Sequence, residues 1–227
     1  MAVEQVFQHL KWMFMFYDRR DAGRRLAKRL QEYARREDVV VAGLLRGGIP
    51  VAFEIAQKQH VPLDVLLVRK LGAPNQPELA MGAVAPGGTR ILDHSLIRKL
   101  GLSEQQVDEM ISAEEEKLHR GEQLYADVRP QITVRDKTLI AVDDGIATGA
   151  SMMAGVSVLR AQGAKKVVVA VPVAPPHAVR ELSKVADEVV SLKITDYFPA
   201  VGFFYRDFQQ TTDEEVRDLL RRASQHI

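Results

Sequence analysis

Residues 138–151 read TLIAVDDGIATGAS. The run Thr138–Val142 is apolar and has the length of a buried strand, and after Ser151 apolar residues recur at helical spacing at Met152, Val156 and Leu159. This pattern predicts a strand that passes through a short turn into a helix.

The turn between this strand and helix is suited to an anion. The first amides of a helix have no partner within the helix, and the helix dipole favours negative charge there. Small residues at 145, 147, 149 and 150 let a phosphate approach the backbone, and Thr148 and Ser151 add hydroxyl donors. Asp143 and Asp144 would repel a bare phosphate, so the ligand should also offer hydroxyl groups or a hard cation such as Mg²⁺. A phosphorylated sugar meets both demands.

This stretch resembles the phosphoribosyl pyrophosphate (PRPP) motif of the type I phosphoribosyltransferases. The resemblance implies that Asp143 and Asp144 hold the ribose hydroxyls, act in catalysis and reach Mg²⁺ only indirectly, through PRPP or water. It also implies that the following loop wraps the 5′-phosphate, through Gly145, Ile146, Ala147, Thr148, Gly149, Ala150 and Ser151. The lysine of a nucleoside triphosphate loop and the spacing of a dinucleotide fingerprint are both missing.

Composition is that of an ordinary enzyme. The chain has 227 residues, 46% of them hydrophobic, which suffices for a sizeable core, and 31 basic against 30 acidic residues create no overall field for nucleic acid or membrane. With no cysteine it needs no oxidising compartment, and we expect a cytoplasmic protein. The apolar run within residues 1–17 is shorter than a membrane span and is expected to be a docking segment or a start-site extension.

Outside the motif, the sequence predicts strands at 38–45, 63–68, 165–171 and 187–192, with helices between them. We therefore expect an α/β fold with a mostly parallel, doubly wound sheet, a small C-terminal hood and a helical insertion. The whole chain, 1–227, is expected to be one domain, with a core at 18–193, a lid and insertion at about 71–130, and a hood and C-terminal helix at 194–227.

Two further motifs carry cations at strand ends. Arg46-Gly47-Gly48 follows the first strand, and Arg69-Lys70 follows the second, which we expect to be a central strand. The resemblance implies that both groups bind the pyrophosphate of PRPP and that Arg69 and Lys70 are catalytic. The stretches 71–82 and 86–88 are rich in Gly and Pro and predict a mobile loop that closes over the site.

Residues 91–130 form a longer connection than a crossover requires. Ser103 and Gln106 form a capping box, which predicts a helix from about 104 to 121. We expect this segment to carry part of the lid or a contact in a homo-oligomer.

Residues 18–36 carry many cations on a helical pattern: Arg19, Arg20, Arg24, Arg25, Lys28, Arg29, Arg35 and Arg36. The simple interpretation is a solvated helix face, and the alternative is a nucleic-acid surface. No aromatic residues interleave with them, so nucleic acid is not the expected partner.

Six aromatic rings gather in residues 196–208. The resemblance implies that this region is the hood over a heterocyclic base, with Phe198, Val201 and Phe203 as base-binding residues. Flat apolar rings suit that task. The alternative is a hydrophobic plug that packs the C-terminal helix onto the sheet.

The implied activity is Mg²⁺-dependent transfer of the phosphoribosyl group of PRPP to a nitrogen of a base, with release of pyrophosphate. Members of the resembled family that act on 6-oxopurines generally carry an acidic residue where this chain has Ala147, which cannot transfer a proton. Glu78 could supply a carboxylate instead. The rival hypotheses are a PRPP-sensing, nucleic-acid-binding regulator with little or no catalysis, and a reaction of another phosphorylated sugar.

Overall fold

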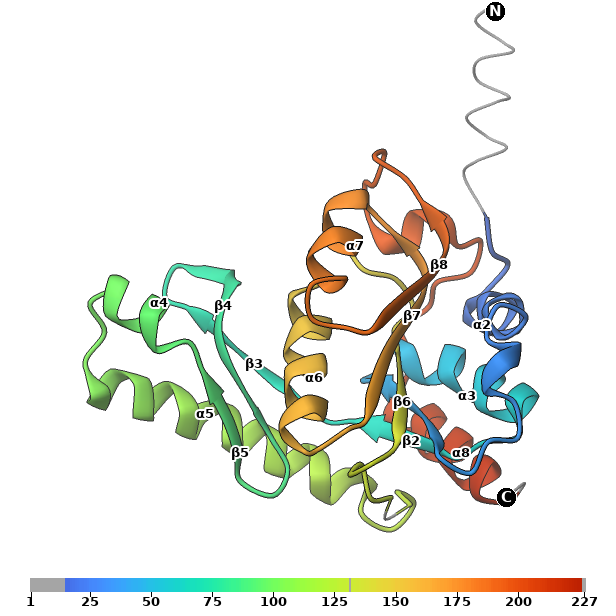
Figure 1. Ribbon diagram of the computed structural model, residues 1–227, viewed down its shortest axis with the longest axis horizontal. Helices are drawn as coiled ribbons and strands as arrows, with labels where there is room; N and C mark the ends of the chain where they lie inside the picture. The colour runs from blue at the N-terminus through green and yellow to red at the C-terminus, as the bar shows by residue number, and fades with distance from the viewer. Residues whose placement is uncertain (1–14, 131, 226–227) are drawn as a thin grey trace, which may run out of the picture.

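A parallel five-stranded sheet forms the centre of the computed structural model, which describes residues 15–130 and 132–225 (Figure 1). The order across the sheet is β2-β1-β6-β7-β8. Strands β1, β2, β6 and β7 are buried along most of their length, as expected for a sheet covered on both faces, and the edge strand β8 is half-buried. Their bounds are β1 Val39–Leu44, β2 Leu63–Leu66, β6 Thr138–Val142, β7 Lys166–Ala174 and β8 Glu188–Ile194. The doubly wound α/β fold expected from the sequence is confirmed.

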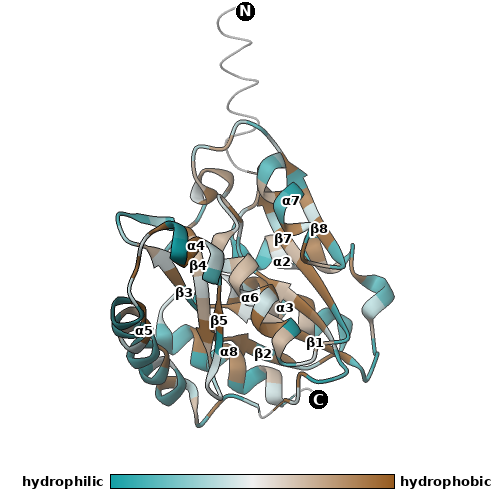
Figure 2. Ribbon diagram, turned by 60° about the vertical axis from the view of Figure 1, so that its left-hand side comes forward, coloured by the Kyte–Doolittle hydropathy of each residue, from teal (hydrophilic) through white to brown (hydrophobic). Residues whose placement is uncertain are grey.

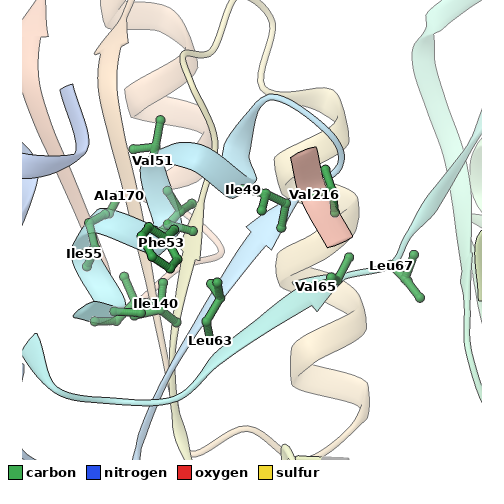
Figure 3. Packing of buried hydrophobic residues seen from close by; sticks show 14 of the residues in the cluster. Ile49, Val51, Phe53, Ile55, Leu63, Val65, Leu67, Ile140, Ala170 and Val216 are labelled. Atoms are coloured by element: carbon green, nitrogen blue, oxygen red, sulfur yellow. The ribbon is translucent and has the colours of Figure 1, made fainter. Parts of the chain in front are cut away.

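Helices cover both faces of this sheet. On one face lie α2 (Arg19–Ala27), α3 (Gly48–Gln59) and α8 (Asp213–Ser224), and on the other α6 (Ala150–Ala161) and α7 (Pro176–Leu182). Figure 3 shows how Val51, Phe53 and Ile55 of α3 pack over residues of the strands beneath them. A short 3-10 turn, η1 (Gln31–Tyr33), follows α2. Because α3 and α6 both start at the carboxyl ends of strands, they set the motifs that precede them at one edge of the sheet.

Most of the stretch expected to be a loop is instead a second sheet, so the loop assignment was wrong, while the mobility and closure of this segment stay predictions. Strands β3 (Arg69–Ala73), β4 (Gln76–Ala85) and β5 (Thr89–Leu92) pair antiparallel. Pro and Gly mark the turns between these strands, with Asn75 in the left-handed region at φ 62°. Alternate residues of the small sheet are buried against its neighbours: Met81 joins the main core, while Ala83 contacts the cluster around α6.

The insertion contains α4 (His94–Lys99) and α5 (Glu104–Tyr125). The capping box of Ser103 and Gln106 is present, but the helix continues beyond the predicted end at residue 121. Tyr125 explains the extra turn, because its ring is buried and its hydroxyl donates to Asp213 Oδ1 over 2.5 Å. The outward face of α5 is hydrophilic (Figure 2), and its inner face packs on β3 and β4.

Towards the end of the chain, the aromatic residues and the last helix pack against different parts of the fold. Residues 196–208, here called the aromatic segment, contain the 3-10 turn η2 (Val201–Phe204) and pack around Val173 of β7. Helix α8 then returns to pack on α3 and β2, with Thr212 as its N-cap. The alternative in which the aromatic rings pack the C-terminal helix onto the sheet is therefore wrong for the described residues.

The proposed docking segment of residues 1–17 lies mostly outside the described residues. Its last part is visible, because Phe16 is buried and pairs with Tyr205 in an isolated parallel bridge. No helix in the described ranges is long and apolar enough to cross a membrane.

Candidate functional site

The acidic pair, Asp143 and Asp144, and the Arg46-Gly47-Gly48 loop lie against each other. They follow β6 and β1, which are hydrogen-bonded neighbours in the sheet with Gly43 opposite Val142. A Cβ atom at position 47 would lie 2.2 Å from Asp144 Oδ2, and one at position 48 would lie 2.5 Å from the Val142 carbonyl oxygen. Only glycine fits at such distances, so two motifs separated by almost a hundred residues form one surface.

Two residues that the sequence did not single out as site residues hold Asp144. Arg19 Nε donates to Asp144 Oδ2 over 2.7 Å, and the Tyr205 hydroxyl donates to the Asp144 carbonyl oxygen over 2.5 Å. The Asp144 amide in turn donates to Asp143 Oδ1 over 2.9 Å. The sequence pattern groups Arg19 with the solvated arginines, and only its position at the start of α2 distinguishes it from them.

Ionisation of the acidic pair, Asp143 and Asp144, is disfavoured in the folded protein. Burial raises the pKa of the Asp143 carboxyl well above its usual range, and the neighbouring Asp144 carboxylate raises it further. Burial also raises the pKa of Asp144, although the Arg19 guanidinium opposes this shift. Hydroxyl donors or a cation bound here would stabilise the charged form.

The motif loop, residues 145–151, is anchored at one end and open at the other. Ile146 is buried, and its amide donates to the Val173 carbonyl over 3.0 Å. Gly149 lies in the left-handed region at φ 79° and places Ala150 at the first position of α6. Ala147, Thr148 and Ser151 are exposed, so hydroxyl groups and a helix N-terminus face solvent together.

Arg69 and Lys70 do not end a central strand, which corrects the expectation from the sequence. Strand β2 is an edge strand, and the two cations open β3 of the small sheet. Arg69 Nε donates to Glu114 Oε2 of α5 over 2.9 Å, and Lys70 Nζ lies 3.3 Å from Glu78 Oε1 of β4. A cleft of about 340 Å³ opens between these cations, α5 and Ser151.

Glu78 connects the small sheet to the motif loop. The Thr148 hydroxyl donates to Glu78 Oε2 over 2.9 Å, while the other carboxylate oxygen faces Lys70. The hydrogen bond from Thr148 and the charge of Lys70 lower the pKa of Glu78, so this side chain is ionised at neutral pH. The Glu78 carboxylate thus occupies the Thr148 hydroxyl, which the motif loop would otherwise offer to a bound anion.

The remaining predicted site residues lie around this centre. Arg46 follows a cis peptide bond from Leu45, and its Nη1 lies 3.4 Å from Asp213 Oδ2 at the start of α8. Val201 reaches the motif directly, since a Cβ at Gly145 would lie 2.6 Å from Val201 Cγ1. The rings of Phe198 and Phe203 are both packed against Phe204, with centroids 5.2 and 5.5 Å away.

The described residues contain no group of three or more His, Cys, Asp or Glu side chains placed to hold a metal ion. The two carboxylates of the acidic pair suit a hard cation such as Mg²⁺. A cation at this point would therefore take most of its ligands from a bound molecule or from water.

Four of the eight cations in residues 18–36 form ion pairs with other described residues. Arg19 pairs with Asp144, Arg24 with Glu54, Arg25 with Asp21 and Arg36 with Asp38. These pairs reduce the positive charge that the segment offers to an outside partner.

The sequence pattern of the family described as "Phosphoribosyl transferase domain" matches residues 16–206. The chain belongs to the type I phosphoribosyltransferase family. The chain is 46% identical, over 93% of its length, to the Mycobacterium tuberculosis protein named "Putative phosphoribosyl transferase Rv0571c". The match covers 47% of that relative, so the chain spans about half the length of the curated relative.

Among solved structures, the chain is similar to TT1426 from Thermus thermophilus. The two share 43% sequence identity, with a TM-score of 0.84, and the match covers 92% of this chain and 99% of the other. The fold and the family are thereby established, and the site described above lies entirely within the matched residues except for Asp213.

Proposed function

We propose that this protein is an Mg²⁺-dependent phosphoribosyltransferase that transfers the 5-phosphoribosyl group of PRPP to a nitrogen of a nucleobase or similar heterocycle. One observation carries the proposal: the acidic pair, the motif loop and the Arg46-Gly47-Gly48 loop meet at the carboxyl ends of two adjacent strands. A ligand that spans them needs hydroxyl groups at its centre and phosphate groups at both ends, which describes PRPP.

Each group has a separate task in this proposal. Asp143 and Asp144 accept hydrogen bonds from the ribose hydroxyls, and residues 145–151 bind the 5′-phosphate with backbone amides and the Thr148 and Ser151 hydroxyls. Residues 46–48, with Arg69 and Lys70, bind the pyrophosphate. Mg²⁺, when bound, would neutralise phosphate charge beside the acidic pair.

The chemistry follows from positioning and charge. The bond between ribose C1 and the pyrophosphate oxygen breaks, and its electron pair leaves on that oxygen. A nitrogen lone pair of the acceptor forms the new bond to C1, and the proton of this nitrogen passes to water. Arg69 and Lys70 would stabilise the charge that develops on the leaving pyrophosphate. To do so, Arg69 must leave its ion pair with Glu114, and Lys70 must leave its ion pair with Glu78, so that both can bind the pyrophosphate. A change of side-chain rotamer or a movement of the small sheet would allow this exchange.

The acceptor is expected to lie under the aromatic segment, beside Val201, Phe198 and Phe203. Of these, Val201 is in contact with the motif loop. Ala147 is exposed and offers no proton acceptor, which argues against 6-oxopurines. The rival regulator hypothesis rests on the basic segment, and the ion pairs of that segment weaken it.

The first test is calorimetric titration of the wild-type chain with PRPP, with and without Mg²⁺. Micromolar binding that requires Mg²⁺, followed by pyrophosphate release with one member of a nucleobase panel, is the expected result. A folded protein that does not bind PRPP would overturn the proposal. Binding of PRPP without turnover of any base, together with binding of RNA or DNA, would favour the regulator.

Glu78 provides a second prediction. Because its carboxylate occupies Thr148 and Lys70, Glu78→Gln should bind ribose 5-phosphate about 3- to 10-fold more tightly, since a charged competitor is removed. Calorimetry measures this change. Glu116→Gln is the matched control, because Glu116 is an exposed residue of α5 paired with Arg120 and should leave the affinity unchanged. Equal affinities for wild type and Glu78→Gln would contradict the competition.

A further inference from the structure

Arg19 stands apart from the other cations of its segment. Its side chain is 12% exposed, and it contacts three parts of the chain at once. Nε donates to Asp144 Oδ2 over 2.7 Å, Nη1 donates to the Gln209 carbonyl oxygen over 2.6 Å, and the guanidinium carbon lies 3.9 Å from the centroid of the Phe208 ring. Two directional hydrogen bonds and a stacked ring define the plane of the guanidinium group.

The partner of Arg19 is held from several sides. The carbonyl oxygen of Asp144 accepts from Tyr205, its amide donates to Asp143, and Gly47 lies against its carboxylate. The backbone of Asp144 is therefore fixed by its neighbours. The ion pair with Arg19 is a directional contact of the carboxylate itself and orients it.

The same contacts lead to the aromatic segment. A Cβ at Gly202 in η2 would lie 2.7 Å from Phe208 Cδ1, so the 3-10 turn rests on the ring that stacks on Arg19. Tyr205 also stacks with Phe208, with ring centroids 5.0 Å apart. Arg19 thus lies between the turn that carries Val201 and Phe203 and the carboxylate of the acidic pair.

We propose that Arg19 is a positioning residue, which fixes the Asp144 carboxylate relative to the aromatic segment so that it meets the hydroxyl groups of a bound ribose. The inference rests on the proposed function, because it assumes that the acidic pair binds a ribose. If the carboxylate could rotate freely, fixing it on binding would cost conformational entropy and reduce the free energy gained from its hydrogen bonds. A carboxylate that is already fixed avoids this cost. Arg19 itself need not touch the ligand.

The test compares ribose 5-phosphate with 2-deoxyribose 5-phosphate, which lacks one of the hydroxyl groups that the acidic pair would bind. Wild type should prefer the ribose compound about tenfold, since a hydrogen bond to a charged group is lost with the deoxy analogue. In Arg19→Gln this preference should fall to about one- to twofold, and Arg19→Lys should restore it to about threefold. Calorimetry with both compounds measures each ratio.

Arg25→Gln is the matched control. Arg25 lies on the same helix and also makes an ion pair, a hydrogen bond to a backbone carbonyl and a contact with an aromatic ring, through Asp21, Met15 and Phe16. If the preference for ribose 5-phosphate depended only on the stability of α2, Arg19→Gln and Arg25→Gln should change it equally. The preference of Arg25→Gln should stay at about tenfold.

Two results would overturn the inference while leaving the proposed function intact: Arg19→Gln keeps the wild-type preference, or Arg25→Gln loses it to the same degree. Failure of wild type to bind both sugar phosphates and PRPP would instead overturn both proposals. If Arg19→Gln does not fold, the same two affinities are measured for Phe208→Leu, which removes the ring that stacks on Arg19 and keeps the ion pair with Asp144. Its preference should fall below tenfold, and an unchanged ratio would refute the role of Arg19.

Discussion

Gly47→Ala is expected to bind PRPP about 100-fold more weakly than wild type, because a displaced loop would lose about two hydrogen bonds to a charged ligand, each worth about tenfold in affinity. The added Cβ would lie 2.2 Å from Asp144 Oδ2 and 2.7 Å from Asp144 Cγ. Asp144 cannot turn aside without breaking its ion pair with Arg19. Either the carboxylate or the loop must therefore move, and calorimetry with PRPP and Mg²⁺ measures the consequence.

Gly121→Ala separates this effect from a general effect of alanine. Position 121 lies inside α5, and a Cβ there would lie 3.7 Å from Leu67 Cδ2, which is an ordinary contact. We expect unchanged PRPP affinity and a gain in stability of about 0.5–1 kcal/mol, the usual difference between alanine and glycine in a helix. Affinity of Gly47→Ala within threefold of wild type would show that the loop does not sit against the ligand.

Asp143→Asn is expected to lose PRPP binding and to gain stability at neutral pH. The folded-state pKa of Asp143 is raised above the ordinary value of 3.8 by burial and by the charge of Asp144. The stabilising contribution of such a group is complete below its unfolded pKa and disappears as the pH rises through the higher folded pKa. At pH 7 the wild-type carboxylate therefore destabilises the fold, whereas the amide is neutral at every pH.

The gain should be about 1–2 kcal/mol at pH 7, corresponding to a melting temperature higher by a few degrees, and it should vanish towards pH 3.5. Thermal melting at both pH values measures it. Asp38→Asn is the control with the opposite sign, because Arg36 lowers the pKa of Asp38 to about 2 and the carboxylate therefore stabilises the fold at neutral pH. A less stable Asp143→Asn at pH 7 would contradict the desolvation argument.

Much of the site could be predicted because its chemistry is local in the sequence. The strand, the acidic pair, the motif loop and the start of α6 occupy 14 consecutive residues, 138–151, and their apolar pattern and small residues identify them without a partner. The parallel sheet was predictable for the same reason, since runs such as Val39–Leu44 are apolar throughout and have strand length.

Residues 71–88 could not be predicted in this way. Glycine and proline indicated a loop, but the segment forms a sheet because α5 and α6 offer apolar surfaces on which Met81 and Ala83 are buried. Whether such a segment pairs or stays open depends on surfaces supplied by distant parts of the chain, and these leave no periodic signal in the segment itself.

The sequence by itself determined the α/β fold, the acidic pair and the motif loop, because each follows from neighbouring residues whose pattern has a direct structural meaning. Only the tertiary structure decided that Arg19 holds Asp144, that Glu78 contacts Thr148 and that Asp213 faces Arg46. These pairs are 125, 70 and 167 residues apart in the chain. A charged side chain is compatible with many exposed positions, and its partner is selected only when helices and strands pack and bring two distant side chains within hydrogen-bonding distance.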